Sequence, residues 1–130
     1  MSRVLLDTHA VLWAALDPRR LGGGARRALQ GNATLLLSAV SLWEIAILSS
    51  LGRISMALSI EELGAACGEN LGVEILAIEP AHLDALAALP FHHRDPFDRL
   101  LVAQAQVERL VLLTADEVVG TYGDSVMFVR

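Results

Sequence analysis

Short apolar runs alternate with longer segments of helical periodicity along this chain. Nearly uninterrupted apolar runs occupy residues 3–6, 33–37, 73–78 and 110–114, and a weaker one lies at 126–129. Runs of this kind predict strands that are buried on both faces. Between them, apolar positions recur every three to four residues. This spacing predicts helices at residues 8–16, 25–29, 41–51, 59–71, 80–89 and 96–109.

Capping residues and prolines agree with several of these predicted helix boundaries. Ser59 followed by Glu62 forms a capping box, which predicts the start of the helix at 59–71. Pro80 is suited to the first turn of the helix at 80–89, and Pro90 stops it. Strands that alternate with helices indicate βαβ units and a parallel sheet. We therefore expect an α/β fold with one domain over residues 1–130: a three-layer α/β/α sandwich around a parallel sheet of four to five strands.

Composition narrows the classes of protein that remain. Apolar residues make up 54% of the 130 residues, so a disordered chain is excluded and some apolar surface is expected to serve a partner. The net charge is −5, and all ten basic residues are Arg. Without Lys, P-loop phosphate binding and Schiff-base chemistry are excluded. One cysteine, Cys67, permits no internal disulfide and, with four His, no Cys-rich zinc site.

Targeting signals are not evident in the sequence. No apolar run approaches 18 residues, so we expect no transmembrane helix. The first residues contain Arg3 and a short apolar stretch that Asp7 interrupts, which is unlike a signal peptide. A cytoplasmic protein is the expectation.

Four acidic residues fall where a parallel sheet gathers ligands. Asp7 directly follows the first predicted strand, and Asp116 follows the fourth by two residues. Glu44 lies one turn into the helix after the second strand, and Asp98 lies in the first turn of the helix at 96–109. Sites in such folds lie beyond the carboxyl ends of the strands. These positions therefore predict four carboxylates at one edge of the sheet.

Each acid also has a purely structural interpretation. Asp7 and Asp116 fit turns or helix caps, and Asp98 fits a favourable interaction with the helix dipole. Glu44 stands within an apolar block, so we expect it to be partly buried and to have an Arg or a cation as its partner. Clustering favours a functional interpretation, because crowded carboxylates repel one another and a divalent cation relieves that repulsion. Oxygen ligands favour Mg²⁺ or Mn²⁺ over zinc, and such a site suits phosphodiester hydrolysis by an activated water.

Longer stretches of the sequence resemble the PIN-domain family, in the branch of VapC-like ribonuclease toxins of prokaryotic type II toxin–antitoxin pairs. The matching stretches are VLLDTHAVLW at 4–13, SAVSLWEIAI at 38–47, LPFHHRDPFDRLLVAQA at 89–105 and LLTAD at 112–116. The resemblance implies a PIN-like fold and an endoribonuclease dependent on Mg²⁺ or Mn²⁺. It also implies inhibition by a cognate antitoxin protein. The family's acids correspond to Asp7, Glu44, Asp98 and Asp116, with Asp7 and Asp98 as principal metal ligands.

Thr8 and Thr114 are candidates to support these acids by hydrogen bonds. One position departs from the family pattern: relatives often carry a Lys directly after the WEIAI block, and here Leu48 takes its place. This weakens the case for a basic residue that holds RNA at that point.

Several other residues have two competing interpretations. His92, His93 and Arg94 either line the RNA path or form a rigid connector. Asp95 either caps the following helix or adds an outer acid to the site. Arg99 either contacts a phosphate or pairs with a site carboxylate.

Other arginine, tryptophan and aliphatic residues also have both a structural and a functional interpretation. The basic group Arg19, Arg20, Arg26 and Arg27 fits a solvated face better than an RNA contact. Trp13 and Trp43 fit core or interface packing better than base stacking. Aliphatic residues of the helices at 41–51 and 59–71 suit a groove for an antitoxin helix, or a homodimer interface.

Three other functions compete with the ribonuclease hypothesis. A receiver-type phosphoryl-signalling domain is disfavoured because it wants a lysine. A haloacid-type phosphatase is disfavoured because Thr8 and His9 follow Asp7, rather than a second acid two residues on. A catalytically silent module that binds RNA or a protein is the main alternative.

Overall fold

The computed structural model describes residues 3–17, 19, 27, 31, 33–91, 95–114, 122 and 126–128. Its strands are β1 (Arg3–Leu6), β2 (Thr34–Ser38), β3 (Glu74–Leu76), β4 (Val111–Thr114) and β5 (Val126–Phe128). Its helices are α1 (Thr8–Leu16), α3 (Ala39–Ser50), α4 (Ile60–Leu71), α5 (Pro80–Ala88) and α6 (Pro96–Glu108). Every one of these elements was expected from the sequence, with ends within two residues of those expected. The predicted helix at 25–29 lies outside the described residues, except for Arg27.

The sheet has five parallel strands in the order β3-β2-β1-β4-β5. The chain builds outward from β1 through β2 to β3, and then returns to the other side of β1 with β4. The strand order therefore reverses between β1 and β4. In open parallel sheets, ligands bind beyond the carboxyl ends of the strands at this switch.

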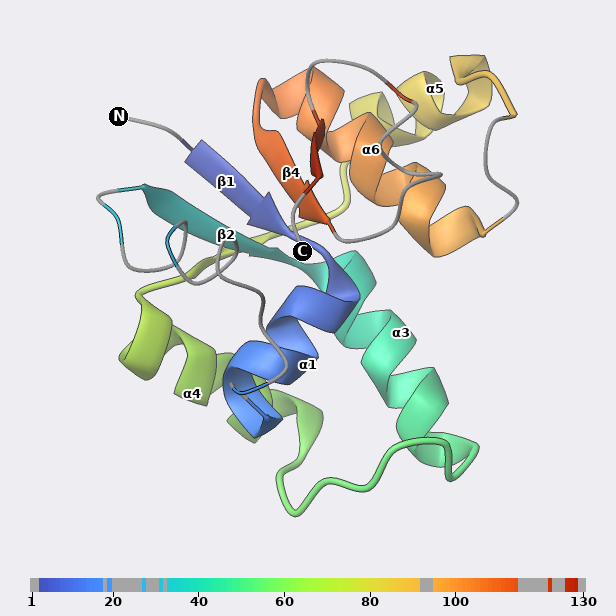
Figure 1. Ribbon diagram of the computed structural model, residues 1–130. Coiled ribbons are helices and arrows are strands. Elements are labelled where there is room, and N and C mark those ends of the chain that lie inside the picture. The colour runs from blue at the N-terminus through green and yellow to red at the C-terminus, as the bar shows by residue number, and fades with distance from the viewer. Residues whose placement is uncertain are drawn as a thin grey trace.

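Helices cover both faces of the sheet, as the predicted three-layer sandwich requires. Figure 1 shows α1, α3 and α4 below the sheet and α5 and α6 above it. Alternate residues of β1 separate the two cores. Val4 and Leu6 join the core under α1 and α4, whereas Leu5 joins the core with Leu101 of α6. Because both faces of the central strands are buried, each carries consecutive apolar residues instead of one at every second position.

A buried polar network links β2 to the helices on the opposite face. Ser38, which ends β2, caps α3 by accepting from Val40 N (3.0 Å) and donates its hydroxyl proton to Gln104 of α6 (2.5 Å). The Gln104 side chain in turn lies 3.3 Å from His82 Nδ1 of α5. His82 is fully buried and also accepts at Nδ1 from the backbone N–H of Glu79 (2.9 Å). These contacts fix where α3 begins relative to α6.

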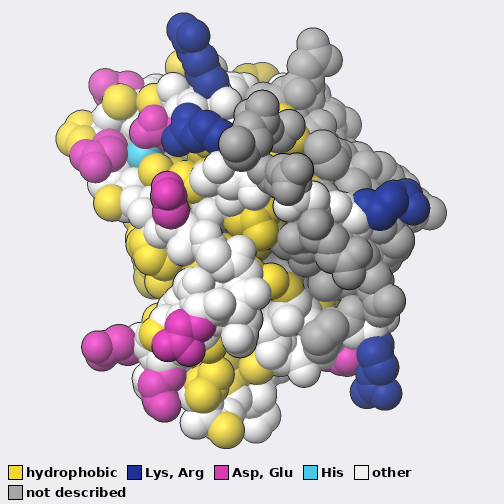
Figure 2. All heavy atoms as spheres, turned by 90° about the vertical axis from the view of Figure 1, so that its left-hand side faces the viewer, with side chains coloured by type: hydrophobic (Ala, Val, Ile, Leu, Met, Phe, Trp, Pro, Cys, Tyr) yellow, Lys and Arg dark blue, Asp and Glu magenta, His cyan; other side chains and the backbone are white. Residues whose placement is uncertain are grey.

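The surface retains exposed apolar side chains beside acidic ones. Figure 2 views the molecule from the left-hand side of Figure 1, where hydrophobic side chains form several patches and acidic side chains project mostly at the left of the view. Phe91 is 84% exposed, and Leu51 is 63% exposed. Cys67 of α4, by contrast, is buried in the core beneath α1, and burial raises the pKa of its thiol. Among the described residues, no helix has the length and hydropathy needed to cross a bilayer.

Candidate active site at the carboxyl edge of the sheet

Asp7 lies at the point where β1 ends and α1 begins. Its backbone N–H donates to Leu113 O of β4 (3.2 Å), which fixes it at the switch between the two strands. Its side chain caps α1, with Oδ1 accepting from Ala10 N (2.7 Å), and the residue is only 7% exposed. The capping interpretation of Asp7 is therefore confirmed. Because a carboxylate accepts several hydrogen bonds or cation contacts, the cap leaves room for a second role.

Glu44 projects from α3 into the neighbourhood of Asp7. Burial is the largest influence on this side chain and raises its pKa above the ordinary 4.5. A hydrogen bond with Thr8 lowers the pKa, whereas the negative charges of Asp95 and Asp7 raise it and His9 lowers it. The net pKa is raised. Segments far apart in the sequence thus bring at least three acids within electrostatic reach of one another.

The expected partner of Glu44 was an Arg or a cation. Among the described residues, the groups that favour its charged form are the Thr8 hydroxyl and the His9 imidazole, and the cation stays a prediction. Thr8 is buried, and its hydroxyl also lies 3.2 Å from Ser41 Oγ, one turn before Glu44 on α3. Thr8 was expected to support the site by hydrogen bonds, and it does. The role of His9 was missed, although the sequence places it directly after Asp7 and Thr8.

The first turn of α6 adds two further acids. Asp95 caps the helix, with Oδ1 accepting from Phe97 N (2.8 Å) and Asp98 N (3.4 Å). Its capping role is confirmed, and its charge also acts on Glu44. Asp98 follows three residues later on the same turn, as predicted. This turn therefore lies beside α3, where the Phe97 ring meets that of Trp43.

The described residues include three of the four predicted metal ligands, Asp7, Glu44 and Asp98. Asp116 lies outside the described residues, as do His92, His93 and Arg94. Among the residues that are described, no three His, Cys, Asp or Glu side chains form a group that could by itself hold a metal ion. The donor chemistry nevertheless fits a hard divalent cation: the nearby groups are carboxylate oxygens, and their repulsion adds to the burial that raises the pKa of Glu44.

The expected pairing of Arg99 with a site carboxylate is wrong for the described residues, and its contact with a phosphate stays a prediction. Its guanidinium donates to the carbonyl oxygens of Leu86 (3.4 Å) and Leu89 (3.1 Å) at the C-terminal end of α5. It also stacks on the Phe91 ring, 4.1 Å from the centroid. A cation is favourable at a helix C-terminus, where carbonyl groups lack helical partners. Arg99 therefore joins α5 to α6 instead of contacting a carboxylate.

The two tryptophans differ in exposure and in the rings that they contact. Trp43 is 54% exposed, so packing within the core is wrong for it, and its ring meets Phe97 edge-on at 4.8 Å. Trp13 is partly buried and packs against the core, with its ring 5.8 Å from the His9 ring. Core packing is therefore confirmed for Trp13 alone.

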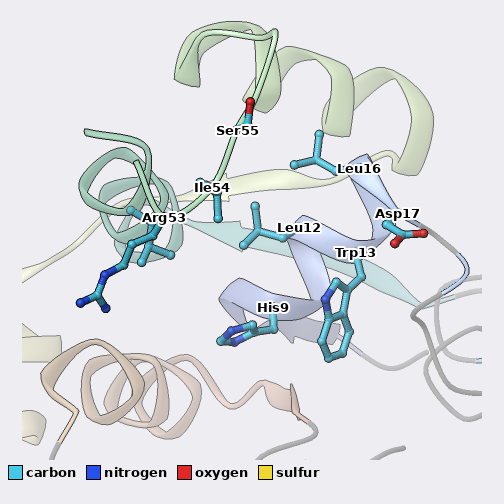
Figure 3. A pocket seen from close by; sticks show the side chains of 9 residues that line it. His9, Leu12, Trp13, Leu16, Asp17, Arg53, Ile54 and Ser55 are labelled. Atoms are coloured by element: carbon cyan, nitrogen blue, oxygen red, sulfur yellow. The ribbon is translucent and has the colours of Figure 1, made fainter. Parts of the chain in front are cut away.

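A pocket of about 440 Å³ lies next to His9, on the α1 side of the acids. Apolar residues of α1 and α3 form part of its lining, and residues 53–55 complete it. The lining residues are His9, Leu12, Trp13, Leu16, Asp17, Leu48, Arg53, Ile54 and Ser55. Figure 3 shows Leu12 and Ile54 pointing into the space between α1 and the segment after α3. This pocket differs from the groove expected from the sequence, which lies between the helices at 41–51 and 59–71 and stays a prediction.

Comparisons with known proteins agree in sequence and in fold. A family model described as PIN domain matches residues 4–122. Over 117 residues the chain is 32% identical to Ribonuclease VapC22 of Mycobacterium tuberculosis, covering 89% of this chain and 88% of that protein. VapBC2 from Rickettsia felis, solved with a DNA fragment from its promoter, has a TM-score of 0.70 at 13% identity and covers 97% of this chain and 96% of that one. A toxin–antitoxin complex from Klebsiella pneumoniae has a TM-score of 0.65 at 17% identity, with 95% of both chains covered.

Proposed function

The chain belongs to the PIN domain family, and from this premise we propose that it is a metal-dependent endoribonuclease and the toxin of a toxin–antitoxin pair. Its curated relative is a ribonuclease, and a structural neighbour is a toxin–antitoxin complex. The observation that carries the proposal is the surroundings of Glu44. Burial raises the pKa of Glu44, and Asp95 and Asp7, from two other segments of the chain, raise it further at the switch point of the sheet.

In this proposal Asp7, Glu44, Asp98 and Asp116 hold Mg²⁺ or Mn²⁺. When bound, such a cation supplies Lewis-acid polarisation of the phosphodiester and lowers the pKa of an attacking water. Thr8 orients the Glu44 carboxylate by its hydrogen bond, and the Asp7 cap fixes the start of α1. With its raised pKa, Glu44 accepts a proton more readily than an ordinary glutamate does.

Cleavage of structured RNA tests the proposal directly. We expect wild-type protein to cleave RNA with Mn²⁺ or Mg²⁺ and to stop in EDTA. Asp98→Asn should reduce the rate by at least about 100-fold, since several kcal/mol of charge stabilisation depend on the ligand set. Asp84→Asn, which changes an exposed acid on α5, is the matched control and should keep full activity.

The same experiment separates the proposal from its main alternative. Cleavage that ignores both EDTA and Asp98→Asn would refute a metal-dependent nuclease. RNA binding without cleavage, and without heat of Mg²⁺ or Mn²⁺ binding in calorimetry, would favour a silent binding module. Comparing rates with Mg²⁺ and Mn²⁺ at equal concentration identifies the better cofactor.

The pocket beside His9 is the proposed site for the antitoxin. Its apolar lining suits an aliphatic side chain on a partner helix, and Arg53 at the lining suits an acidic neighbour on that helix. Ile54→Glu should abolish inhibition by the co-expressed antitoxin while RNA cleavage persists. Leu51→Glu, at a 63% exposed position that does not line the pocket, should leave inhibition unchanged. Equal inhibition of both variants would place the antitoxin elsewhere.

Two further properties complete the proposal. The protein acts on RNA in the cytoplasm, and its exposed apolar side chains suit a homodimer. Sedimentation equilibrium on the toxin without antitoxin should give twice the chain mass.

A further inference from the structure

An aromatic pair, Trp43 and Phe97, joins α3 to α6. Trp43 leaves 54% of its surface exposed, whereas Phe97 is partly buried against the core. Its ring centroid lies 4.8 Å from that of Phe97, and the two ring planes meet at 77°. This edge-to-face contact restrains the Trp43 ring. A large aromatic side chain that is held in place and still faces solvent is available for a ligand.

The pair directly borders the acids of the proposed site. Trp43 immediately precedes Glu44 on α3, and Phe97 immediately precedes Asp98 on α6. Consecutive residues of a helix differ by about 100° in direction and about 1.5 Å in height. The aromatic pair and the two acids therefore occupy adjoining faces of the same two helices. A phosphate bound at the acids would have its neighbouring nucleotide at the aromatic pair.

We propose that Trp43, supported by Phe97, is a stacking platform for an unpaired RNA base next to the cleaved phosphate. The inference rests on the proposed ribonuclease function and adds a substrate-binding residue to it. Aromatic side chains bind bases by stacking without regard to sequence, because every base has a π face. Stacking also supplies affinity without cations, and Arg99, the cation nearest in sequence to these acids on α6, is directed toward α5.

The enzyme side of the test compares two substitutions of Trp43. Trp43→Leu should raise KM for single-stranded RNA by about 5- to 150-fold, which corresponds to about 1–3 kcal/mol of base stacking. Trp43→Phe keeps an aromatic face and should recover part of the loss. Leu83→Ala, at an exposed position on α5, is the control and should leave KM unchanged. In all variants kcat should change much less than KM.

The substrate side of the test shows whether a base is the ligand. Once the cut is mapped, RNAs with a single abasic ribose at each flanking nucleotide are compared. At one of these positions the abasic change should cancel the effect of Trp43→Leu, because the stacking partner is then already missing. An unchanged KM for Trp43→Leu, or a penalty that persists on every abasic RNA, overturns the inference.

Two other experimental results would overturn the inference for different reasons. If sedimentation shows that Trp43→Leu converts a dimer into a monomer, the pair is a protein interface and the inference is overturned. If wild-type protein cleaves no RNA with either metal, the proposed function itself fails, and the inference fails with it. Normal cleavage by wild type together with normal KM for Trp43→Leu refutes only the inference.

Discussion

Glu44 shows how a single residue reports on the crowding of a site. Its apolar neighbours in the sequence correctly predicted partial burial, and burial is the largest cause of its raised pKa. The sequence did not reveal that Thr8 and His9, rather than an Arg, stabilise its charge. These groups are 36 and 35 positions away in the chain, and only the packing of α1 on α3 brings them together.

The raised pKa of Glu44 predicts how activity depends on pH. Glu44 keeps its proton to a higher pH than an ordinary glutamate, so the charged form that attracts a cation accumulates only as the pH rises past the raised value. RNA cleavage should therefore increase as the pH rises above 4.5 and through the raised pKa, as crowded carboxylates release protons and take up metal. Initial rates at constant ionic strength would measure this, and a flat profile would contradict the crowding of the acids.

The same shift predicts an effect of opposite sign on stability. The folded protein binds the Glu44 proton more tightly than the unfolded chain does, so this residue contributes stability below its ordinary pKa of 4.5. That contribution is lost as the pH rises through the raised value. At pH 7 without metal, Glu44→Gln should raise the melting temperature by roughly 1–4 °C. The gain should shrink toward pH 4, and a lower melting temperature at pH 7 would contradict it.

At the scale of elements, the N-terminus of α6 combines a structural and an electrostatic task. Asp95 caps the helix through Phe97 N and Asp98 N, and its charge also raises the pKa of Glu44. The cap was predicted from the sequence, because Asp before Pro96 is typical of a helix start. The influence on Glu44 depends on where α6 meets α3, which local patterns do not specify.

Two substitutions separate these tasks. Asp95→Asn keeps a good capping side chain and should cost little stability, whereas Asp95→Ala should cost about 1 kcal/mol. Both remove the charge and should shift the rising limb of the pH–activity profile to lower pH by the same amount. Chemical denaturation and pH–rate curves measure the two effects. Equal destabilisation by both variants would show that the cap contributes nothing.

Local sequence signals located the elements well because most boundaries have local causes. The capping box at Ser59 and Glu62 is present, and Gly72 ends α4 in the left-handed conformation with φ of 66°. Non-local contacts explain the differences. The helix expected from Ser41 begins at Ala39, because Ser38 caps it while bonded to Gln104 of α6. The strand expected at 73–78 shortens to Glu74–Leu76, which pairs with β2.

At the scale of the whole molecule, stability depends on the cores on the two faces of the sheet. Leu101 of α6 is completely buried in the core that α6 shares with residues of the β-strands. Leu101→Ala should reduce the free energy of unfolding by about 2–5 kcal/mol, since it removes buried methyl groups and leaves a cavity. Leu51→Ala, at an exposed position, should change it by less than about 0.5 kcal/mol. Urea denaturation measures both, and similar losses would contradict the described burial.

The burial of Cys67 makes this protein a reporter of its own opening. The chain has a single sulfhydryl, and it is shielded between α4 and the sheet. A thiol-specific dye can therefore label the molecule only when that layer separates from the strands. The labelling rate of Cys67 therefore reports the lifetime of the closed form without any engineered tag. Ligands that stabilise the folded state should lower this rate.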